Sequence, residues 1–567
     1  MPKMLVPAAA FVAVLCLAPR PKLETQDTAA ETVLVNGKIV TVDRAFSTAE
    51  AAAISAGKFT AVGSNAEIRA LAGPNTRTID LHGRTVVPGL ADGHLHGAGG
   101  GPGVDLSRTR SLDEVLSAIG QRVAQSNPGD IIVTNSDWHE AQLKEQRLPL
   151  RRDLDKVSAN NPVVVVRGGH EYILNSRALN KWNITTATSQ PRGGKISTYP
   201  DGELNGELLD AAKPLVKLPP PPERTLDERI QEQVAELKTL NASGLTSIRL
   251  PGTGIEQYRL LEEIKKRGLL TMRVNVLLRP NPVDAATVRA TLQGWGVDPN
   301  QGAHDEWLQI GGIKIGVDGG FEGGYMREPY AEPYGQNGAF RGLQTIPDDR
   351  YTEIVKELNR LGWRVATHAV GDAAIDQVLN AYEAANAERT IVGRRWVLEH
   401  GFIPRDDHYA RIRKLDLVVS AQNHLYLAGP SLVKYWGPRR AAWTTPVRAY
   451  LDQGFVVAGG TDSPVVPYPP LWVIYHFVSR DTIAGGVLGA DQKITREEAL
   501  RIETINNAYL IFQEKMKGSI EPGKLADLVV LSDDILTCPE KQIEKTTVLL
   551  TMVAGNVVYE NAGFRSQ

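Results

Sequence analysis

The chain has 567 residues, of which 42% are hydrophobic and 23% are charged, and its formal net charge is −2. This length exceeds what one compact core normally holds, so we expect two or three domains. The balanced charge, without any basic run, argues against nucleic acid as a partner. Two cysteines, Cys16 and Cys538, are too few for a disulfide framework or a thiolate zinc site.

The first eighteen residues are typical of a secretory signal peptide. A basic start, Met1-Pro2-Lys3, is followed by an apolar stretch of ~15 residues and by small residues that allow cleavage after Ala18. The stretch is too short for a comfortable membrane span, which needs ~20 residues. We therefore predict a periplasmic or secreted protein without stable membrane insertion once residues 1–18 are removed. The alternative is an apolar N-terminus that is not a signal.

Short alternating strands with glycine-containing turns occupy both ends of the remaining chain. Residues 30–85 contain several of them, and residues 515–563 show the same pattern. Because the two terminal segments share this pattern and flank a large central segment, we predict that they form one composite β-sandwich domain.

The middle of the chain, residues 86–514, alternates apolar strands with helical stretches. Eight such βα units predict a (β/α)₈ TIM barrel, which places the protein in the α/β class. The predicted strands are Val86–Ala91, Leu245–Leu250, Met272–Leu278, Ile310–Val317, Arg364–Ala369, Arg395–Glu399, Leu417–Ala421 and Phe455–Gly459.

The connection between the first two predicted strands is far too long for one crossover. It has strands of its own and ends near the stiff stretch Pro219–Pro222. Residues 99–224 are therefore predicted to form an inserted α/β subdomain.

The run VVPGLADGHLHG places His94 and His96 one residue apart at the end of the first strand. Residues i and i+2 of an extended strand point to the same face, so both imidazoles could bind one cation. Alone this pattern is weak, because most isolated His-x-His pairs occur on surfaces by accident.

Further polar residues end other predicted strands, namely His368, His400 and Asp462, while Lys314 lies inside one and Asp318 follows it. Active sites of TIM barrels form at these C-terminal strand ends. His and carboxylate ligands without thiolate suit Zn²⁺, Mn²⁺, Fe²⁺, Co²⁺ or Ni²⁺, of which Zn²⁺ is our default. Such an ion would lower the pKa of water to ~7 and polarise a carbonyl, while Asp462 takes the proton of the water.

In combination, these motifs resemble the amidohydrolase superfamily, and within it the YtcJ-like branch, amidohydrolase family 3. GRTVVPGLADGHLH resembles its first-strand motif and GSIEPGKLADLVVL its closing motif. RLPLRRDLDKVSANNPVVVVRGGHEYILNSRAL resembles the insertion of this branch, and GIKIGVDGG, THAVGD and LEH complete the set. The resemblance covers nearly the whole chain after the signal.

The resemblance implies a divalent metal centre with one or two ions per chain, held by His94, His96, Lys314, His368, His400 and Asp462. Asp462 would also carry protons. Lys314 would be carboxylated, because a plain ammonium repels cations; the alternative is a one-metal site in which Lys314 pairs with Asp318. His170, Asp318 and His424 are the predicted substrate contacts. His170 could instead be buried within the insertion, and His424 could be a plain loop residue.

The implied reaction is attack of metal-activated water on a non-peptide carbon–nitrogen bond of a small molecule, such as an N-acyl, formyl or related amide. Esters, lactones or carbamates are alternative substrates, and a catalytically inactive binding relative is a further alternative. A homo-oligomer is possible. Three places depart from the family pattern and leave the substrate open, namely Trp138-His139, the loop Phe321–Tyr325, and Gln422-Asn423-His424.

Overall fold

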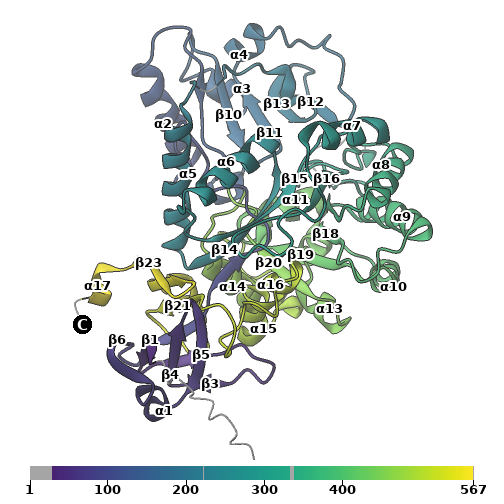
Figure 1. Ribbon diagram of the computed structural model, residues 1–567. Helices are drawn as coiled ribbons and strands as arrows, with labels where there is room; N and C mark the ends of the chain where they lie inside the picture. Colours follow the sequence, from purple (N-terminus) through teal and green to yellow (C-terminus); the bar gives the residue numbers. More distant parts are fainter. Residues whose placement is uncertain (1–28, 221, 332–337, 566–567) are drawn as a thin grey trace, which may run out of the picture.

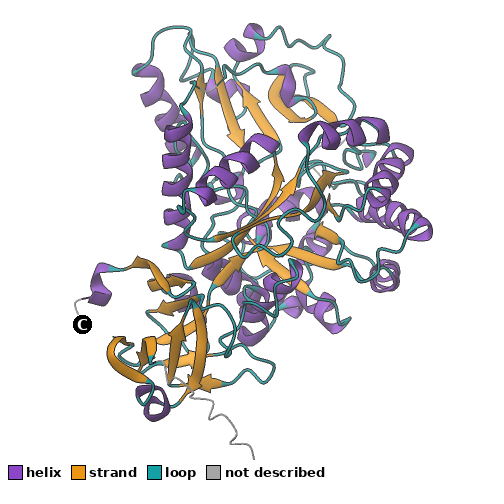
Figure 2. Ribbon diagram, in the orientation of Figure 1, coloured by secondary structure: helices purple, strands orange, loops and turns teal. Residues whose placement is uncertain are grey.

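The computed structural model describes residues 29–220, 222–331 and 338–565. The predicted signal peptide, residues 1–18, lies outside the described residues. In Figure 1 the chain forms three parts: an insertion at the top, a barrel in the middle and a two-sheet β-domain at the bottom. Figure 2 shows helices around the barrel strands and almost none in the β-domain.

The central sheet has eight parallel strands in the order β20-β19-β18-β17-β16-β15-β14-β8, which confirms the predicted TIM-barrel fold. Two backbone hydrogen bonds draw its outer strands together, because Gly93 donates to Gly459 at 2.7 Å and Asp462 donates to His94 at 2.6 Å. The strands are β8 (Leu90–Asp92), β14 (Leu245–Thr253), β15 (Arg273–Leu278), β16 (Leu308–Gly316), β17 (Val365–Ala369), β18 (Val397–His400), β19 (Val418–Gln422) and β20 (Val457–Gly460).

Helices cover the outside of these strands, and three of them, α5, α7 and α15, begin at a residue whose side chain caps the helix. The first, α5, starts at a capping box in which Thr225 and Glu228 satisfy each other's backbone amides. The helices of the barrel are α5 (Leu226–Asn241), α6 (Ile255–Lys266), α7 (Ala285–Trp295), α8 (Asp348–Arg360), α9 (Asp372–Glu388), α10 (Asp406–Lys414), α11 (His424–Trp436), α12 (Pro438–Ala442), α13 (Val447–Asp452), α14 (Pro470–Ser479), α15 (Arg496–Ile502) and α16 (Ile505–Leu510).

The β-domain contains strands from both ends of the chain. One sheet has the order β23-β22-β21-β7-β2-β3 and the other β5-β4-β1-β6, and residues of both share one hydrophobic core. The strands are β1 (Ala30–Val35), β2 (Lys38–Val40), β3 (Thr48–Ala49), β4 (Ala51–Ser55), β5 (Lys58–Gly63), β6 (Ala72–Asp80), β7 (Thr85–Pro88), β21 (Leu528–Leu531), β22 (Val548–Val553) and β23 (Asn556–Glu560), accompanied by helices α1 (Asn65–Arg69) and α17 (Ala562–Arg565).

The first predicted barrel strand, Val86–Ala91, is in fact two strands in two different sheets. β7 pairs with β21 in the β-domain, and β8 pairs with β14 in the barrel. Gly89 separates them, and a Cβ there would lie 2.2 Å from Oγ1 of Thr246. The chain therefore changes sheets at a position where only glycine allows the close approach.

The insertion lies between β8 and α5 and has its own five-stranded sheet, in the order β12-β13-β11-β10-β9. Its elements are α2 (Leu112–Ala124), β9 (Ile132–Val133), α3 (Arg151–Leu154), β10 (Val163–Arg167), β11 (Glu171–Leu174), α4 (Ser176–Lys181), β12 (Gly194–Thr198) and β13 (Leu204–Asp210). The turn between β10 and β11 carries His170.

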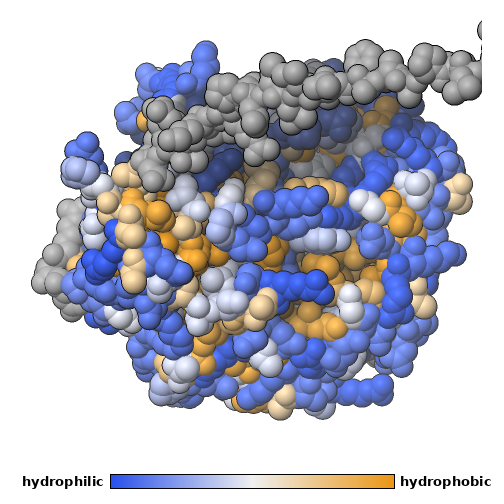
Figure 3. Space-filling view, turned by 60° about the horizontal axis from the view of Figure 1, so that its bottom comes forward, coloured by the Kyte–Doolittle hydropathy of each residue, from blue (hydrophilic) through white to orange (hydrophobic). Residues whose placement is uncertain are grey.

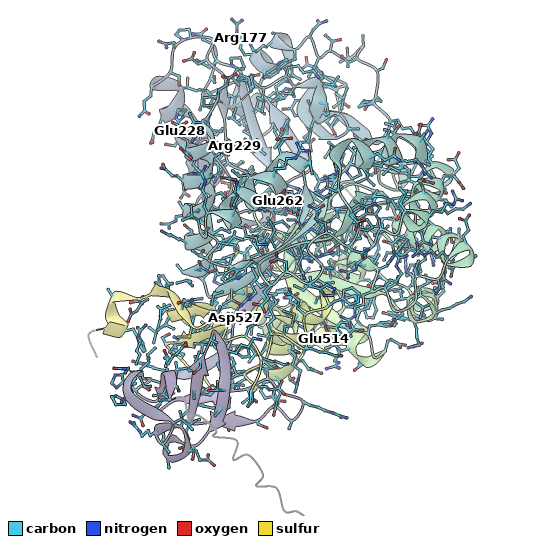
Figure 4. All side chains as sticks on the ribbon, in the orientation of Figure 1. Arg177, Glu228, Arg229, Glu262, Glu514 and Asp527 are labelled. Carbon is cyan, nitrogen blue, oxygen red and sulfur yellow. The ribbon has the colours of Figure 1, made fainter. Side chains whose placement is uncertain are left out.

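A buried ion pair joins the barrel to the β-domain. Nε and Nη2 of Arg273, at the start of β15, donate to the two carboxylate oxygens of Asp527 at 2.7 and 2.9 Å. Both side chains are almost fully buried, and Asp527 also accepts from the backbone of Ala554. Figure 4 shows Asp527 where the two parts meet.

We expect Asp527→Ala to lower the free energy of unfolding by about 3–5 kcal/mol, because Arg273 would remain buried without its acid. Thermal or urea denaturation measures this loss. The control is Asp452→Ala, which removes an exposed partner of Arg448 and should cost less than about 1 kcal/mol. Equal losses in the two variants would contradict a structural role for the buried pair.

Within the described ranges, no helix is both long and apolar enough to cross a membrane. On the face that Figure 3 presents, hydrophilic residues predominate, and hydrophobic residues form separate groups between them.

Candidate metal centre

The predicted ligands meet at the C-terminal ends of the barrel strands. The strand register aligns these ends, since Gly316 pairs with His368 and Ala369 pairs with His400. His94 and His96 follow β8, Lys314 lies near the end of β16, His368 and His400 lie near or at the ends of β17 and β18, and Asp462 follows β20.

Asp462 is the centre of two groups of possible ligand atoms. Its Oδ1 lies 3.4 Å from Nε2 of His94 and 3.0 Å from Nε2 of His96. Its Oδ2 lies 3.0 Å from Nε2 of His424, and His400 completes that second group. Within each group the ligand atoms lie within 4.8 Å of one another. One carboxylate therefore faces two sets of imidazoles.

His368 borders the second group, with its ring centroid 4.6 Å from that of His400. Its Nε2 lies 3.2 Å from the carbonyl oxygen of Gly319. A carbonyl only accepts hydrogen bonds, so Nε2 carries the proton and Nδ1 keeps the lone pair that a cation needs.

Buried hydrogen bonds orient two of the other imidazoles in the same way. Nδ1 of His94 lies 2.7 Å from a carboxylate oxygen of Glu399, and Nδ1 of His400 lies 2.7 Å from Oε1 of Gln422. Both partners accept, so each Nδ1 carries the proton and each Nε2 keeps the lone pair that can bind a metal. Glu399 is held in turn by Arg249 at 2.7 Å. The sequence analysis assigned no role to Glu399 or Arg249.

Unusual backbone conformations help to aim these side chains. His400 and Asp462 have φ values of 70° and 60°, in the left-handed region that non-glycine residues rarely adopt. Such strain is typical of functional sites, where the surrounding structure over-determines the conformation. Here Asp92 contributes, because its carboxylate accepts from the backbone of His94 and of Thr461.

The ionisation states fit a divalent cation. Burial lowers the pKa of His94 to about 4 and holds those of His368 and His400 well below the ordinary value, so these rings are neutral. Burial would raise the pKa of Asp462, but the neighbouring histidines, His94 first, hold it well below its usual range. Neutral imidazoles and an ionised carboxylate are the ligand forms that transition metals bind.

Lys314 lies beside the imidazoles rather than beside Asp318. Its Nζ is 3.2 Å from Nε2 of His94, and it forms no ion pair with Asp318 among the residues described. The alternative pairing considered from the sequence is therefore not the observed one. Burial lowers the pKa of Lys314 to about 8.

The carboxylate of Asp318 is hydrogen-bonded by backbone amides. Its carboxylate accepts hydrogen bonds from the amides of Tyr325, Val370 and Gly371, which tie its loop to the start of α9. It also lies 3.4 Å from Nε2 of His368. Burial raises the pKa of Asp318 to about 7. The carboxylate thus positions the loop after β16, and its predicted contact with substrate stays a prediction.

His170 reaches the barrel mouth although it belongs to the insertion. Its ring centroid lies 5.5 Å from that of His368, and it lines the same cleft as His94, Lys314 and Asp462. Nδ1 of His170 lies 2.6 Å from Oδ1 of Asp210, so its Nε2 is the free nitrogen. Burial alone would lower the pKa of His170, but Asp210 raises it above its usual value.

We expect His170→Ala to reduce kcat/KM at least about tenfold, the effect of losing ~1.4 kcal/mol of transition-state stabilisation. Stability should change much less, because the ring is partly exposed. Steady-state kinetics and a melting curve measure the two effects. The control is His82→Ala, an exposed histidine of the β-domain. Unchanged kinetics would remove His170 from the site.

A small inner compartment adjoins the imidazoles. Its volume is about 30 Å³, enough for about two waters and far below the ~150 Å³ of a cavity that binds benzene. Aromatic side chains line it, with Phe321 stacked on Phe402 at 5.7 Å and both rings packed against His424. All three places where the sequence departs from the family pattern contribute to it: Trp138, His139, Phe321, Glu322 and His424.

Comparisons with known proteins agree with this geometry. A sequence model described as "Amidohydrolase family" matches residues 77–559. The chain is 30% identical over 561 residues to a protein named "N-substituted formamide deformylase" from Arthrobacter pascens, covering 94% of this chain and 98% of that one. It is 27% identical over 503 residues to YtcJ of Bacillus subtilis, an amidohydrolase by name, covering 86% and 92%.

Solved structures with the same fold include two described as uncharacterized metal-dependent hydrolases. The Pyrococcus furiosus protein matches with a TM-score of 0.63 and 25% identity, covering 89% of this chain and 100% of that one. The Pyrococcus horikoshii protein matches with a TM-score of 0.66 and 23% identity, covering 90% and 99%, and supports the fold alone.

Proposed function

The chain belongs to the amidohydrolase family, a family of metal-dependent hydrolases, and we propose that it hydrolyses a carbon–nitrogen bond other than a peptide bond in a small amide. The observation that supports this most is the convergence of four histidines and Lys314 around the carboxylate of Asp462 at the barrel mouth. The name of the Arthrobacter relative favours an amide as the substrate.

The residues that would hold the metal are His94, His96, His368, His400 and Asp462, together with Lys314 in a modified form. Nitrogen and oxygen donors without thiolate favour Zn²⁺ among the common divalent ions for hydrolysis. When bound, the ion would lower the pKa of water and polarise the carbonyl of the amide.

Asp462 would move the proton during the reaction. Water adds to the amide carbon, its proton passes to the Asp462 carboxylate, and the same proton reaches the departing nitrogen as the carbon–nitrogen bond breaks. His424 holds Oδ2 of Asp462 and so fixes the carboxylate for both transfers. His170 faces the reacting group from the insertion side of the cleft.

Lys314 is proposed to be carboxylated. With its pKa lowered to about 8 by burial, roughly a tenth of the amine is neutral near pH 7. A neutral amine attacks CO₂, forms a carbon–nitrogen bond and releases a proton, which leaves an anionic carbamate. That product has oxygens for two cations, whereas an ammonium beside a divalent ion would be repelled.

The size of the two cavities suggests how the amide is oriented. The inner compartment, of about 30 Å³, accepts only a small group, such as a formyl hydrogen or a methyl. The wider cleft outside, of about 700 Å³, has room for the amine part of the substrate. We therefore propose a formamide or another amide with a short acyl group.

A substrate series tests this proposal. Metal-loaded protein is assayed with amides of one amine that carry formyl, acetyl, butyryl and benzoyl groups, and with the matching esters. We expect activity on the amides that falls steeply beyond acetyl. Preference for esters, or for long acyl groups, would contradict the proposed substrate class, and no hydrolysis with metal bound would favour an inactive binding relative.

A further inference from the structure

Charges of both signs line the outer cleft, and two of its cations form no ion pair with the residues described. Three aspartates line it, and each is already engaged: Asp210 by His170, Asp318 by three backbone amides, and Asp462 by histidines. Of its cations, Lys314 belongs to the metal centre, whereas Lys213 and Arg279 line the cleft without an ion pair to any residue that the structure describes.

Arg279 lies near the predicted ligand His96 at the edge of the metal centre. It follows β15, and its backbone amide donates to Thr253 at 3.0 Å. Gly252 opposite has a φ of 84°, and a Cβ there would lie 3.6 Å from Cδ of Arg279 and 3.8 Å from the His96 ring. The side chains of Arg279 and of the predicted ligand His96 therefore both lie close to Gly252, which has no side chain of its own.

The guanidinium of Arg279 is available for a ligand. The residue is exposed to the cleft, and none of its side-chain nitrogens has a hydrogen-bond or acidic partner among the described residues. Nearby protein atoms partly desolvate the side chain and so lower the pKa of Arg279. The charge is nevertheless permanent at neutral pH, because arginine stays protonated in proteins.

Lys213 strengthens the positive field from the insertion side. Its ammonium donates to the carbonyl of Gly169 and lies 4.7 Å from the ring centroid of Tyr172. Neither partner is an acid, and Asp210, Glu322 and Glu171 act on Lys213 only from beyond ion-pair distance. Lys213 is therefore a second cation in the cleft that can attract a carboxylate.

We propose that the outer cleft binds an amide whose amine part carries a carboxylate, and that Arg279 is the residue that binds this carboxylate. This inference rests on the proposed function, in which the amine part lies in the outer cleft. A guanidinium suits the role because its planar fork donates two parallel hydrogen bonds to one carboxylate.

A matched pair of ligands tests the inference. N-formylphenylalanine, used as the racemate, and N-(2-phenylethyl)formamide differ only by the carboxylate. Calorimetry measures their binding to metal-loaded protein that carries Asp462→Asn to prevent turnover. We expect the carboxylated ligand to bind about 10–100-fold more tightly, the value of a hydrogen-bonded charge pair. The preference should shrink as salt concentration rises.

The measurement is repeated on protein that also carries Arg279→Met, in which the two binding constants should differ by no more than about threefold. Arg279→Lys should restore part of the preference for the carboxylated ligand. The control is Arg439→Met, which removes an exposed arginine of α12 that lines neither cavity and should leave the ratio unchanged. A preference that survives Arg279→Met means that the metal or Lys213 binds the carboxylate, and overturns the assignment. Equal binding of both ligands to the parent protein overturns the substrate class.

This design separates the inference from the proposed function. Binding is measured without turnover, so a carboxylate preference that depends on Arg279 supports the inference even if the protein with Asp462 intact hydrolyses neither compound. That second result would contradict the proposed function alone.

Discussion

Replacing Asp462 by asparagine should leave at least one metal ion bound but reduce amide hydrolysis by ~10²–10⁴-fold. Asparagine keeps the shape and one oxygen, so the contacts of Oδ1 with His94 and His96 lose only part of their strength. It cannot accept the proton of the attacking water. Metal analysis and steady-state kinetics on the same preparation measure both effects.

The matched control for this variant is Asp376→Asn, because Asp376 belongs to a separate cluster with Arg327 and His408. That change should leave turnover within a few-fold of normal. Near-normal turnover of Asp462→Asn would mean that another group accepts the proton. Asp318 would then be examined first, since burial raises its pKa to about 7 and it lies 3.4 Å from His368.

The second large effect is expected at Lys314. Loss of partners that merely orient metal ligands already costs ~10–100-fold, so Lys314→Ala, which removes a ligand, should cost at least that much activity. We expect the metal content to fall from about two ions per chain to about one. A short carboxylic acid such as acetate should restore part of the activity, because it replaces the missing carbamate.

Bicarbonate provides an independent test of the modified lysine. Metal-free protein that is reconstituted with metal should recover more activity with bicarbonate than without it. The control is Lys517→Ala, which removes another buried lysine. Lys517 donates to Ser247, far from the strand ends that carry the site. This variant should show the same bicarbonate response as the parent protein. Bicarbonate-independent activity with one tightly bound ion per chain would instead establish a one-metal site with an unmodified Lys314.

The barrel was predictable because its strands lie in apolar runs, several of which contain or are followed by His, Asp or Lys side chains. His94, His368, His400 and Asp462 each follow or end such a run, and parallel strands of one barrel bring their C-terminal ends together. The exact start of the barrel was not predictable. Val86–Ala91 is one apolar run in the sequence, and only the three-dimensional contact of Gly89 with Thr246 shows that it changes sheets.

The residues that position the predicted metal ligands were not identified from the sequence, for a different reason. Strand alternation predicts that Glu399 and His400 point to opposite faces. The positive φ of His400 breaks this alternation, so both neighbours reach the site. Arg249 and Asp210 were missed because their roles depend on partners far away in the chain, Glu399 and His170.

The loop after β16 shows what the sequence could and could not indicate. Its departure from the family pattern at Phe321 and Glu322 was visible, but not its consequence. Only the packing of Phe321 on Phe402 and His424 shows that this loop narrows the inner compartment. A sequence pattern indicates that a site differs from those of its relatives, whereas the size of a cavity depends on side chains from several strands.

The central claim is that the histidine cluster holds a metal on which amide hydrolysis depends. Its most direct test is the hydrolysis of an N-substituted formamide before and after metal is removed with a chelator, and again after Zn²⁺ is returned. We predict that turnover disappears with the metal and comes back with Zn²⁺. Undiminished turnover in protein from which all metal has been removed would contradict this account.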